Sequence, residues 1–283
     1  MIPAAVTDWL VENEYGNVES SRQVGGGCIN NGVLLWTSEG NSFFLKTNAQ
    51  APEDMFAREV EGLEALGVDD GPRVPKSYLN ASDFLLMEDL APVSRASDYW
   101  DDFGRKMAAL HNHTSERFGF EHDNYIGSTP QPNPWTDDGY EFFSQHRLVF
   151  QAEMAARRGL LSSKEAGQVE QLANRLRDLV PEQPASLIHG DLWGGNAMTD
   201  EKGAPAIIDP ATHYGWAEAD LAMTALFGGF NDRFYSAYIE SRPIPSGWRN
   251  RFSLYNLYHL LNHLNLFGRG YHGQVMGVVR RYM

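Results

Sequence analysis

The amino-acid sequence predicts an α+β fold with two lobes, a β-rich N-terminal lobe of residues 1–90 and a mainly helical C-terminal lobe of residues 91–283. Short, apolar, β-prone runs separated by turn residues dominate the N-terminal part, which is typical of strands. After Ala91-Pro92 the composition shifts from strand-like to helix-like segments. A chain of 283 residues is long enough to bury a sizeable core in two lobes.

Composition is ordinary for a globular enzyme, with 42% apolar and 21% charged residues. The net charge of −14 argues against a nucleic acid or an anionic membrane as partner, because neither surface would attract the chain. No apolar run approaches twenty residues and Met1–Ala4 lacks signal-peptide features, so we expect a cytoplasmic protein. The single cysteine, Cys28, excludes an intramolecular disulfide but could still link two chains.

The first strands follow a short amphipathic turn or helix expected at Thr7–Asn13, and a glycine-rich segment joins two of them. Consecutive glycines let the backbone fold over a charged group and point its N–H groups at phosphate oxygens. The segment has neither a G-x-G-x-x-G nor a Walker A sequence, so its residues alone fit a plain hairpin turn equally well. The phosphate-binding candidates are Gly25, Gly26, Gly27, Cys28, Ile29 and Asn30.

A lysine ends the next predicted strand, Ser42–Lys46. It either solvates the strand end or binds nucleotide phosphates, as the third-strand lysine of kinases does. Apolar residues then recur at helical spacing over Met55–Leu66. Glu59 lies beside a core-facing position of that helix and could reach Lys46, whereas the helix's other glutamates are expected to be solvated. We therefore predict an ion pair between Lys46 and Glu59.

Two more strands are expected at Val74–Leu79 and Phe84–Leu90. The second runs into Ala91-Pro92, where a hinge between the lobes belongs. In a nucleotide-binding arrangement of this kind, the backbone of the hinge faces the adenine ring. The residues predicted to take that position are Met87, Glu88, Asp89 and Leu90.

The C-terminal lobe is predicted to be helical apart from one long loop. Helices are expected at Ala96–Asn112, Asp138–Arg158, Ser163–Leu179 and over most of Ala217–Gly268, with a break at Pro243-Ile244-Pro245. His111 and His113 face different sides of a helix, so we predict no metal site there. The loop Phe118–Trp135 is rich in Gly, Asn, Gln and Pro, and its amides suit either a polyhydroxylated acceptor or ordinary loop chemistry.

A polar turn in this lobe carries the clearest chemistry. Two apolar runs, Ala185–Ile188 and Pro205–Ile208, read as strands of one small sheet, and polar residues follow each of them. Asp191 and Asn196 have the H-x-D-x-x-x-x-N spacing of a kinase catalytic loop, and Asp209 lies where a metal-binding aspartate is expected. Asp191 would accept a hydroxyl proton, while Asn196 and Asp209 would hold Mg²⁺. The alternative is a polar turn between two strands.

Several segments taken together resemble the fructosamine kinase (ketosamine 3-kinase) family over nearly the whole chain. They include His189–Asn196 with a tryptophan after Asp-Leu, Ile208–Ala211, Tyr214–Met223, Leu226–Phe230, Gly26–Asn30, Phe44–Lys46, Pro130–Asn133 and Asn262-His263. The resemblance implies a protein-kinase-like fold close to that of aminoglycoside phosphotransferases. Asp-Pro-Ala stands where protein kinases have Asp-Phe-Gly, so we expect no activation-loop regulation.

The resemblance also implies roles for individual residues. Asp191 would be the base, and ATP phosphates would lie under Gly25–Asn30 beside Lys46. Trp193 would stack on or wall the sugar. His263 would line the acceptor site, although a core histidine fits its position equally well. His189 and Asp220 would be structural, with Asp220 anchoring the catalytic loop.

The implied function is ATP-dependent phosphorylation of a ketosamine, at O3, with Mg²⁺ as cofactor and a role in deglycation. The acceptor would be a free ribulosamine or fructosamine or a glycated lysine of a protein. We expect a monomer, with a dimer linked through Cys28 left open. The alternatives are a kinase of the same fold acting on an aminoglycoside, choline or homoserine, and a nucleotide-binding pseudokinase. A pseudokinase should lack at least one of four residues that are all present, Lys46, Asp191, Asn196 and Asp209.

Overall fold

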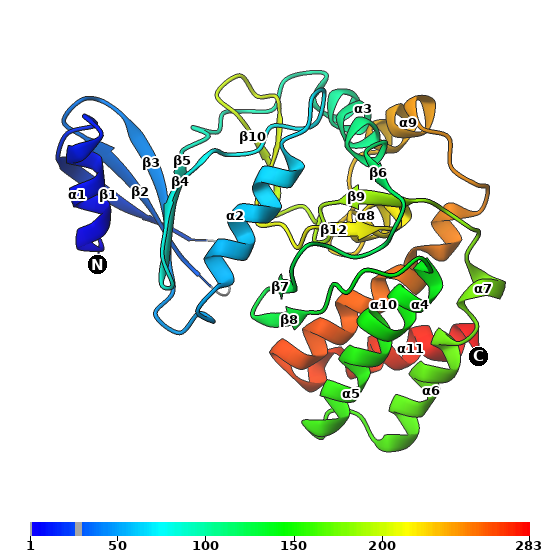
Figure 1. The fold of residues 1–283 in the computed structure, drawn as a ribbon. Helices are drawn as coiled ribbons and strands as arrows, with labels where there is room; N and C mark the ends of the chain where they lie inside the picture. The colour runs from blue at the N-terminus through cyan, green and yellow to red at the C-terminus, as the bar shows by residue number, and fades with distance from the viewer. Residues whose placement is uncertain (1, 26–29) are drawn as a thin grey trace.

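A five-stranded antiparallel sheet occupies most of the N-terminal part of the computed structural model, which describes residues 2–25 and 30–283. The sheet order is β1-β2-β3-β5-β4 (Figure 1). Its strands are β1 (Val18–Val24), β2 (Asn31–Thr37), β3 (Ser42–Thr47), β4 (Ser77–Asn80) and β5 (Phe84–Glu88). Helix α1 (Ala4–Glu12) lies against the sheet at the far end of the molecule, and α2 (Met55–Leu66) lies between the sheet and the helical part.

The two faces of this sheet bury alternate residues, as the two-residue period of a strand requires. Leu45 and Leu86 face α1 and pack with Val6 and Leu10. Their neighbours on the opposite face pack against α2 in a second cluster, made of Phe56, Leu63, Leu85 and Met87. The sheet is therefore covered on both sides, which fixes the register of β3 and the side from which Lys46 projects.

Three smaller sheets lie between the five-stranded sheet and the C-terminal helices among the described residues. They are β10 (Ala197–Thr199) with β11 (Pro205–Ile207), β12 (His213–Gly215) with β9 (Ala185–Ile188) and β6 (Thr114–Ser115), and β7 (Asn124–Ile126) with β8 (Thr129–Gln131). The prediction that residues 185–188 and 205–208 share one sheet is wrong. A short turn lets β11 pair locally with β10, so β9 takes β12 as its partner instead. The predicted long loop 118–135 likewise contains the β7–β8 hairpin.

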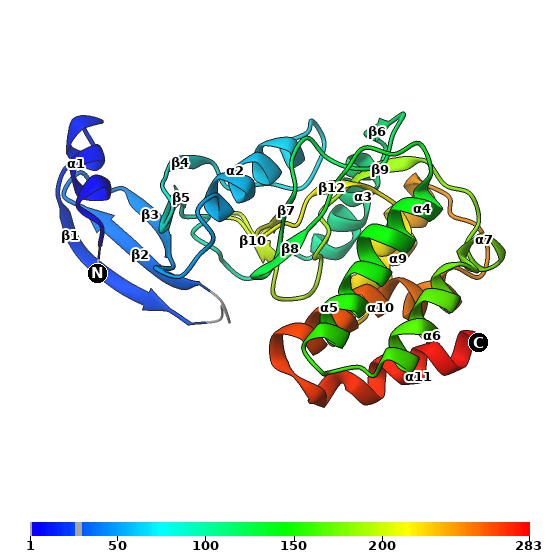
Figure 2. The ribbon, with the colours of Figure 1, turned by 60° about the horizontal axis from the view of Figure 1, so that its bottom comes forward.

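The remaining chain is mainly helical. Its elements are α3 (Tyr99–His111), α4 (Gly139–Phe143), the π-helical turn η1 (Ser144–Val149), α5 (Phe150–Arg157), α6 (Ser163–Ala173), α7 (Leu176–Leu179), α8 (Ala217–Met223), α9 (Asp232–Ser241), α10 (Trp248–Phe267), the 3₁₀ turn η2 (Arg269–Tyr271) and α11 (His272–Tyr282). Figures 1 and 2 show α5, α6, α10 and α11 gathered on the side away from the five-stranded sheet. Helix α10 runs through this block and buries residues on every side.

The predicted α+β arrangement, with strands first and helices after, is confirmed. The helix expected over 138–158 is interrupted by the π-helical turn, and the one expected over 163–179 breaks between α6 and α7. A capping box at Ser162 and Glu165 explains the sharp start of α6. In the part of the chain that the structure describes, no helix is both long and apolar enough to cross a lipid bilayer.

Two backbone contacts connect the N-terminal part of the chain to the β10–β11 sheet, in addition to the covalent connection after β5. The backbone of Arg73 donates to Pro205 at 3.1 Å and accepts from Ile207 at 2.8 Å, so this residue extends the β10–β11 sheet. After β5, Ala91 has a φ of +44°, and Thr199 donates its hydroxyl to the Val93 carbonyl at 2.7 Å. The chain just after the predicted hinge is thus held against the β10–β11 sheet.

Candidate active site

Gly190 shapes the turn His189–Asn196, which the sequence predicts to be catalytic and which is called the catalytic turn below. Its φ of +82° lies in the left-handed region that side chains disfavour. A Cβ at this position would lie 2.1 Å from the carbonyl oxygen of Ala211, so there is no room for one. The Ala211 N–H donates to the His189 carbonyl at 2.9 Å, which holds the two strands of chain together at this point. Glycine is therefore required both for the backbone angle and for the close approach.

We expect Gly190→Ala to destabilise the protein by at least about 2 kcal/mol and to abolish turnover, because strain and a backbone clash act together. Thermal unfolding and steady-state kinetics measure the two effects. Gly167→Ala is the matched control, since a Cβ there meets nothing within 4 Å inside α6. That control should gain about 0.5–1 kcal/mol instead. Equal melting temperatures for the two variants would contradict the steric argument.

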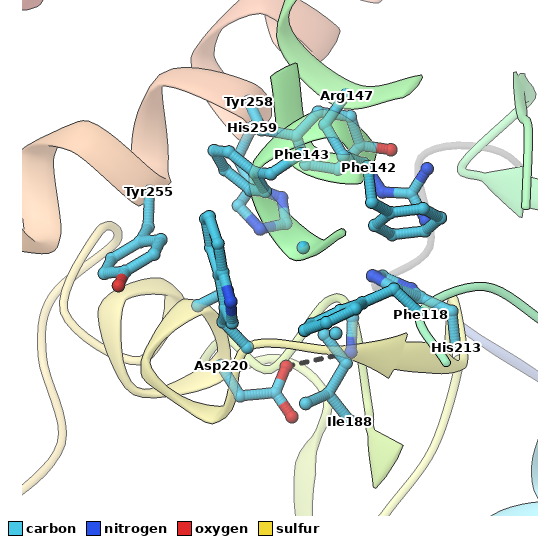
Figure 3. Close-up of a pocket in the computed structure, with 15 residues that line it drawn as sticks. Phe118, Phe142, Phe143, Arg147, Ile188, His213, Asp220, Tyr255, Tyr258 and His259 are labelled. Atoms are coloured by element: carbon cyan, nitrogen blue, oxygen red, sulfur yellow. Dashed lines mark hydrogen bonds between the residues drawn. The ribbon is translucent and has the colours of Figure 1, made fainter. Parts of the chain in front are cut away.

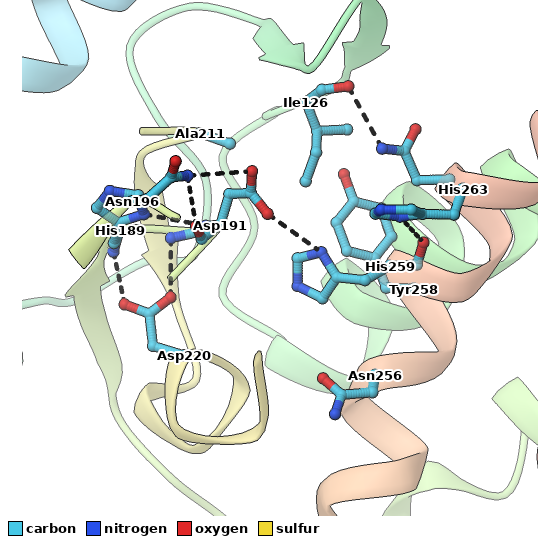
Figure 4. Close-up of polar contacts among 12 residues, drawn as sticks. Ile126, His189, Asp191, Asn196, Ala211, Asp220, Asn256, Tyr258, His259 and His263 are labelled. Atoms are coloured by element: carbon cyan, nitrogen blue, oxygen red, sulfur yellow. Dashed lines mark hydrogen bonds and ion pairs between the residues drawn. The ribbon is translucent and has the colours of Figure 1, made fainter. Parts of the chain in front are cut away.

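Asp220, at 1% exposure, anchors the turn from α8. Its carboxylate accepts the N–H of Gly190 at 2.8 Å (Figures 3 and 4) and the N–H of His189 at 2.7 Å (Figure 4). The same carboxylate lies 3.2 Å from Nε2 of His111. Burial alone would raise the pKa of Asp220, but its hydrogen bond with His111, the electrostatic interactions with the His111 and His189 rings and the hydrogen bond from the Gly190 N–H together lower it. The lowered pKa favours an ionised carboxylate at this position, in contact with the turn that Asp220 was predicted to anchor.

His189 ties the turn to the chain before Asp209. Its Nε2 lies 2.9 Å from the Ile208 carbonyl oxygen, which makes this nitrogen the donor. Its Nδ1 therefore accepts the Asp191 N–H, at 3.2 Å. Burial lowers the pKa of His189, which keeps the ring neutral and suits one donor and one acceptor. Both ring nitrogens of His189 therefore bond to backbone atoms, which is a structural role.

Asn196 links Asp191, the predicted base, to Asp209, the predicted metal ligand. Its Nδ2 donates to the Asp191 carbonyl at 2.9 Å and lies 3.3 Å from the Asp209 carbonyl. The same nitrogen is 3.4 Å from Oδ2 of Asp191. Burial, followed by the negative charges of Asp209 and Asp220, raises the pKa of Asp191 to about 7. A carboxylate with this pKa is suited to accept a proton near neutral pH.

Lys46 joins the N-terminal sheet to this group. Its ammonium contacts the carboxylates of both Glu59 and Asp209. Burial opposes its charge, but the two carboxylates together raise the pKa of Lys46 above its ordinary value. The contact between Lys46 and Glu59 predicted from the sequence is present. Gly62 lets α2 approach closely here, because a Cβ on it would lie 3.0 Å from the Thr212 hydroxyl.

The predicted nucleotide-binding segments are placed in part. Gly26, Gly27, Cys28 and Ile29 lie outside the described residues, while Gly25 is exposed and the Asn30 side chain accepts from Asn48 at 3.1 Å. Met87 is buried in the core beneath α2. Glu88 pairs with Arg73, and Asp89 accepts the Ala91 N–H at 2.9 Å. Leu90 is also buried. The side chains of the predicted hinge therefore make contacts within the protein that hold the hinge backbone in place.

Trp193 and His263, the two residues predicted to line the acceptor site, both contact the ring of Phe227. The Phe227 ring centroid is 6.1 Å from that of Trp193 and 4.9 Å from that of His263, and Phe227 is 38% exposed. His263 is partly buried, and its Nδ1 bonds to the carbonyl of His259 one turn earlier at 2.8 Å. Sequence reasoning gave Phe227 no role, because only the fold places it between two residues far apart in the chain.

Two side-chain amides of the 118–135 segment form hydrogen bonds with other parts of the protein. Gln131 and Asn133 are each 1% exposed. Gln131 donates to the Ala211 carbonyl at 3.0 Å, and Asn133 accepts from the buried Arg147 at 2.6 Å. Of the two explanations left open by the sequence, ordinary structural chemistry therefore fits these two residues. They brace the chain just after Asp209 against η1.

A small cavity lies against Gly190 and Asp220, and aromatic residues from several elements, α4 and α10 among them, line part of it (Figure 3). The volume of this cavity is about 20 Å³. A single water needs about 10–15 Å³ of such space, so the cavity can hold water but no sugar. The Trp193–Phe227 pair lies outside this cavity and is partly exposed to solvent.

Comparisons with known proteins were consistent with one another. The family model described as Fructosamine kinase matches residues 4–283. A probable ketoamine kinase of Synechocystis is 43% identical over 269 residues, covering 93% of this chain and 90% of its own. The chloroplastic protein-ribulosamine 3-kinase of Oryza sativa subsp. japonica is 38% identical over 289 residues, covering 98% and 83%.

Solved structures give the same result for the fold. A candidate fructosamine-3-kinase from Thermobifida fusca has a TM-score of 0.88 and 33% identity, with 98% of this chain and 97% of that chain covered. A choline kinase from Streptococcus pneumoniae aligns with a TM-score of 0.63 over 98% and 96% of the two chains, at 15% identity. The second likeness shows the fold alone. The predicted protein-kinase-like fold is thereby confirmed.

Proposed function

The chain belongs to the fructosamine kinase family, and on that premise we propose that it transfers the γ-phosphoryl group of ATP to a hydroxyl of a ketosamine, at O3. The observation that carries the proposal is the convergence of Asp191, Asn196 and Asp209 with the Lys46–Glu59 pair. Five polar side chains from three separate parts of the chain meet there. A polar turn between strands needs none of them in this order.

Asp191 orients the acceptor hydroxyl and receives its proton. Phosphoryl transfer passes through a loose transition state, so positioning and charge neutralisation account for most of the acceleration. The proton moves late from the hydroxyl to the carboxylate, as the oxygen–phosphorus bond forms and the bond to the ADP oxygen breaks. A pKa near 7 leaves Asp191 ionised in most molecules at slightly alkaline pH.

The residues around Asp209 fit a magnesium ion by the chemistry of their donor atoms. Among the described residues no three His, Cys, Asp or Glu side chains form a metal cluster. Mg²⁺ in kinases needs few protein ligands, however, because phosphate oxygens and water complete its shell. Asp209, whose side chain is 42% exposed, and the amide oxygen of Asn196 would hold it. When bound, the ion neutralises charge on the phosphates.

Lys46 binds the nucleotide phosphates in this proposal, with Glu59 keeping the ammonium in position. The five-stranded sheet belongs to a nucleotide-binding lobe of residues 1–90, with the glycine segment 25–30 over the phosphates and the backbone of residues 87–90 facing adenine. Residues 91–283 form the catalytic and acceptor-binding lobe. The close contact of Lys46 with Asp209 supports this arrangement, because the ammonium already lies beside the proposed metal ligand.

The acceptor is a ketosamine, either a small molecule or a modified lysine of a protein, with Trp193 and His263 lining its site. Support comes from the relatives named ketoamine kinase and protein-ribulosamine 3-kinase. A 3-phosphorylated ketosamine is less stable and releases its amine, so deglycation follows as the biological role. A monomer is proposed, and a dimer linked through Cys28 remains an alternative state.

The decisive experiment offers ribulosyl-lysine and fructosyl-lysine side by side with Mg–ATP, and product analysis locates the phosphate. An aminoglycoside, choline and homoserine complete the panel, because they are the acceptors of the alternative small-molecule kinases. Phosphate on O3 of a ketosamine is the expected result. Turnover confined to another acceptor would reject the substrate class, and ATP binding without turnover on any acceptor would favour a pseudokinase.

The activity should depend on pH through Asp191. Its carboxylate must be ionised to accept a proton, and burial with two neighbouring carboxylates raises its pKa to about 7. We therefore expect kcat/KM to be highest above that pH and to fall about tenfold per unit well below it. Initial rates between pH 5 and 9 in constant ionic strength measure this. A flat profile down to about pH 5 would contradict the assignment of Asp191 as base.

A further inference from the structure

A second histidine of α10, His259, faces the catalytic aspartate. Its Nδ1 lies 3.9 Å from Oδ1 of Asp191 (Figure 4), and the residue is only 4% exposed. Among the described residues this nitrogen has no hydrogen-bond partner. Leaving a buried polar atom without a hydrogen-bond partner costs about 1–3 kcal/mol of stability. Such atoms are rare in folded proteins, and a catalytic role is one reason for their presence.

The next histidine of the helix provides an internal comparison. His263 satisfies its Nδ1 within the helix, on the carbonyl of His259 at 2.8 Å. His259 lies one turn earlier on the same helix and is more deeply buried, yet its Nδ1 is directed at Asp191 instead of a helix carbonyl. The orientation of the His259 ring therefore leaves its Nδ1 free to face the aspartate.

His259 is neutral in these surroundings. Burial, followed by the nearby His263, lowers its pKa to about 3, with Asp220 opposing and Arg147 adding to the effect. A neutral imidazole carries one N–H, on either nitrogen. Placed on Nδ1, that hydrogen points toward an oxygen of the Asp191 carboxylate, and an ionised carboxylate has acceptors but no donor. The ring can then supply a hydrogen bond without a positive charge.

The two oxygens of Asp191 have different neighbours. Oδ2 faces Nδ2 of Asn196 at 3.4 Å, and Oδ1 faces Nδ1 of His259 at 3.9 Å. Both separations are longer than a good hydrogen bond. Catalytic hydrogen bonds are often long without substrate and shorten in the loaded complex. A movement of about 1 Å would give the carboxylate one donor on each oxygen.

We propose that His259 is a positioning residue, whose Nδ1–H donates to Oδ1 of Asp191 in the substrate-loaded site. Together with Asn196 it fixes the plane of the carboxylate, so that a remaining lone pair faces the acceptor hydroxyl. This inference rests on the proposed function, because it assumes that Asp191 is the base. It adds a residue of α10 to the catalytic arrangement.

Three substitutions of His259 test the proposal, because only one of them restores a donor at the right place. Asparagine places its amide nitrogen near the position of Nδ1, glutamine places it near Nε2, and leucine has no donor. We expect His259→Leu and His259→Gln to lower kcat by about 10- to 100-fold, as misplacement of a catalytic group does. His259→Asn should recover most of the wild-type kcat. KM for Mg–ATP should stay within about twofold throughout, since ATP contacts lie elsewhere.

His113→Leu is the control, since this histidine is exposed and lies outside the site. The wild-type enzyme is assayed first on ribulosyl-lysine, and failure there would reject the proposed function rather than the role of His259. Wild-type kcat in His259→Leu would overturn the inference. So would equal losses in the asparagine and glutamine variants, a comparison that still decides the question if the leucine variant does not fold.

Discussion

Asp191→Asn is expected to lower kcat by about 10²- to 10⁴-fold while the affinity for Mg–ATP stays within about twofold. Asparagine preserves the size of the side chain, but its amide cannot take the hydroxyl proton. Lys46 and Asp209, the proposed ligands of the nucleotide phosphates and of the metal, are untouched. Steady-state kinetics on a ketosamine and calorimetric titration of the nucleotide separate the two effects.

The same substitution should leave the fold intact and increase its stability at alkaline pH. The pKa of Asp191 is raised in the folded protein, so its ionisation reduces stability as pH rises from about 4 through about 7. The asparagine variant lacks that loss, and its melting temperature at pH 8 should equal or exceed the wild-type value. Asp137→Asn is the control, because that side chain is 87% exposed. Near-normal turnover by Asp191→Asn would show that another group is the base.

Local patterns were enough to predict the elements that carry Lys46 and Glu59. The helix expected over Met55–Leu66 has those same bounds in the structure, because its apolar period is clear and turns flank it. The strand before it extends only one residue further than predicted. The spacing between Asp191 and Asn196 is equally local, since a single turn brings both residues to Asp209. These features depend on neighbours in the sequence.

Features that depend on distant pairing could not be predicted in the same way. The partner of β9 is β12 rather than β11, and the choice depends on which strands close local hairpins. The π-helical turn η1 places Arg147 against Asn133, and no periodicity marks it in advance. His259 was missed as well, although its four-residue spacing from His263 puts both on one helix face. Only the packing of α10 shows that this face meets Asp191.

Asp220→Ala should have the second large effect, on stability and on catalysis together. The substitution leaves the N–H groups of His189 and Gly190 and the ring of His111 without their buried acceptor. Breaking a buried charged network of this kind costs about 3–5 kcal/mol. For a chain of this length that lowers the melting temperature by roughly 10 °C. The catalytic turn loses its anchor at the same time, so kcat should fall at least about 100-fold even at temperatures where the variant is folded.

Glu218→Ala separates the two effects, because it removes another buried carboxylate from the same helix. Glu218 is fully buried and binds Arg251 through both oxygens, at 2.7 and 2.8 Å, without touching the catalytic turn. That variant should lose a similar amount of stability and keep kcat within about threefold of the wild type at temperatures where it is folded. Both variants are assayed well below their own melting temperatures. If Asp220→Ala then kept the turnover of Glu218→Ala, Asp220 would only support the fold, and the geometry of Asp191 would have to be set by His189, Asn196 and the helix that carries His259.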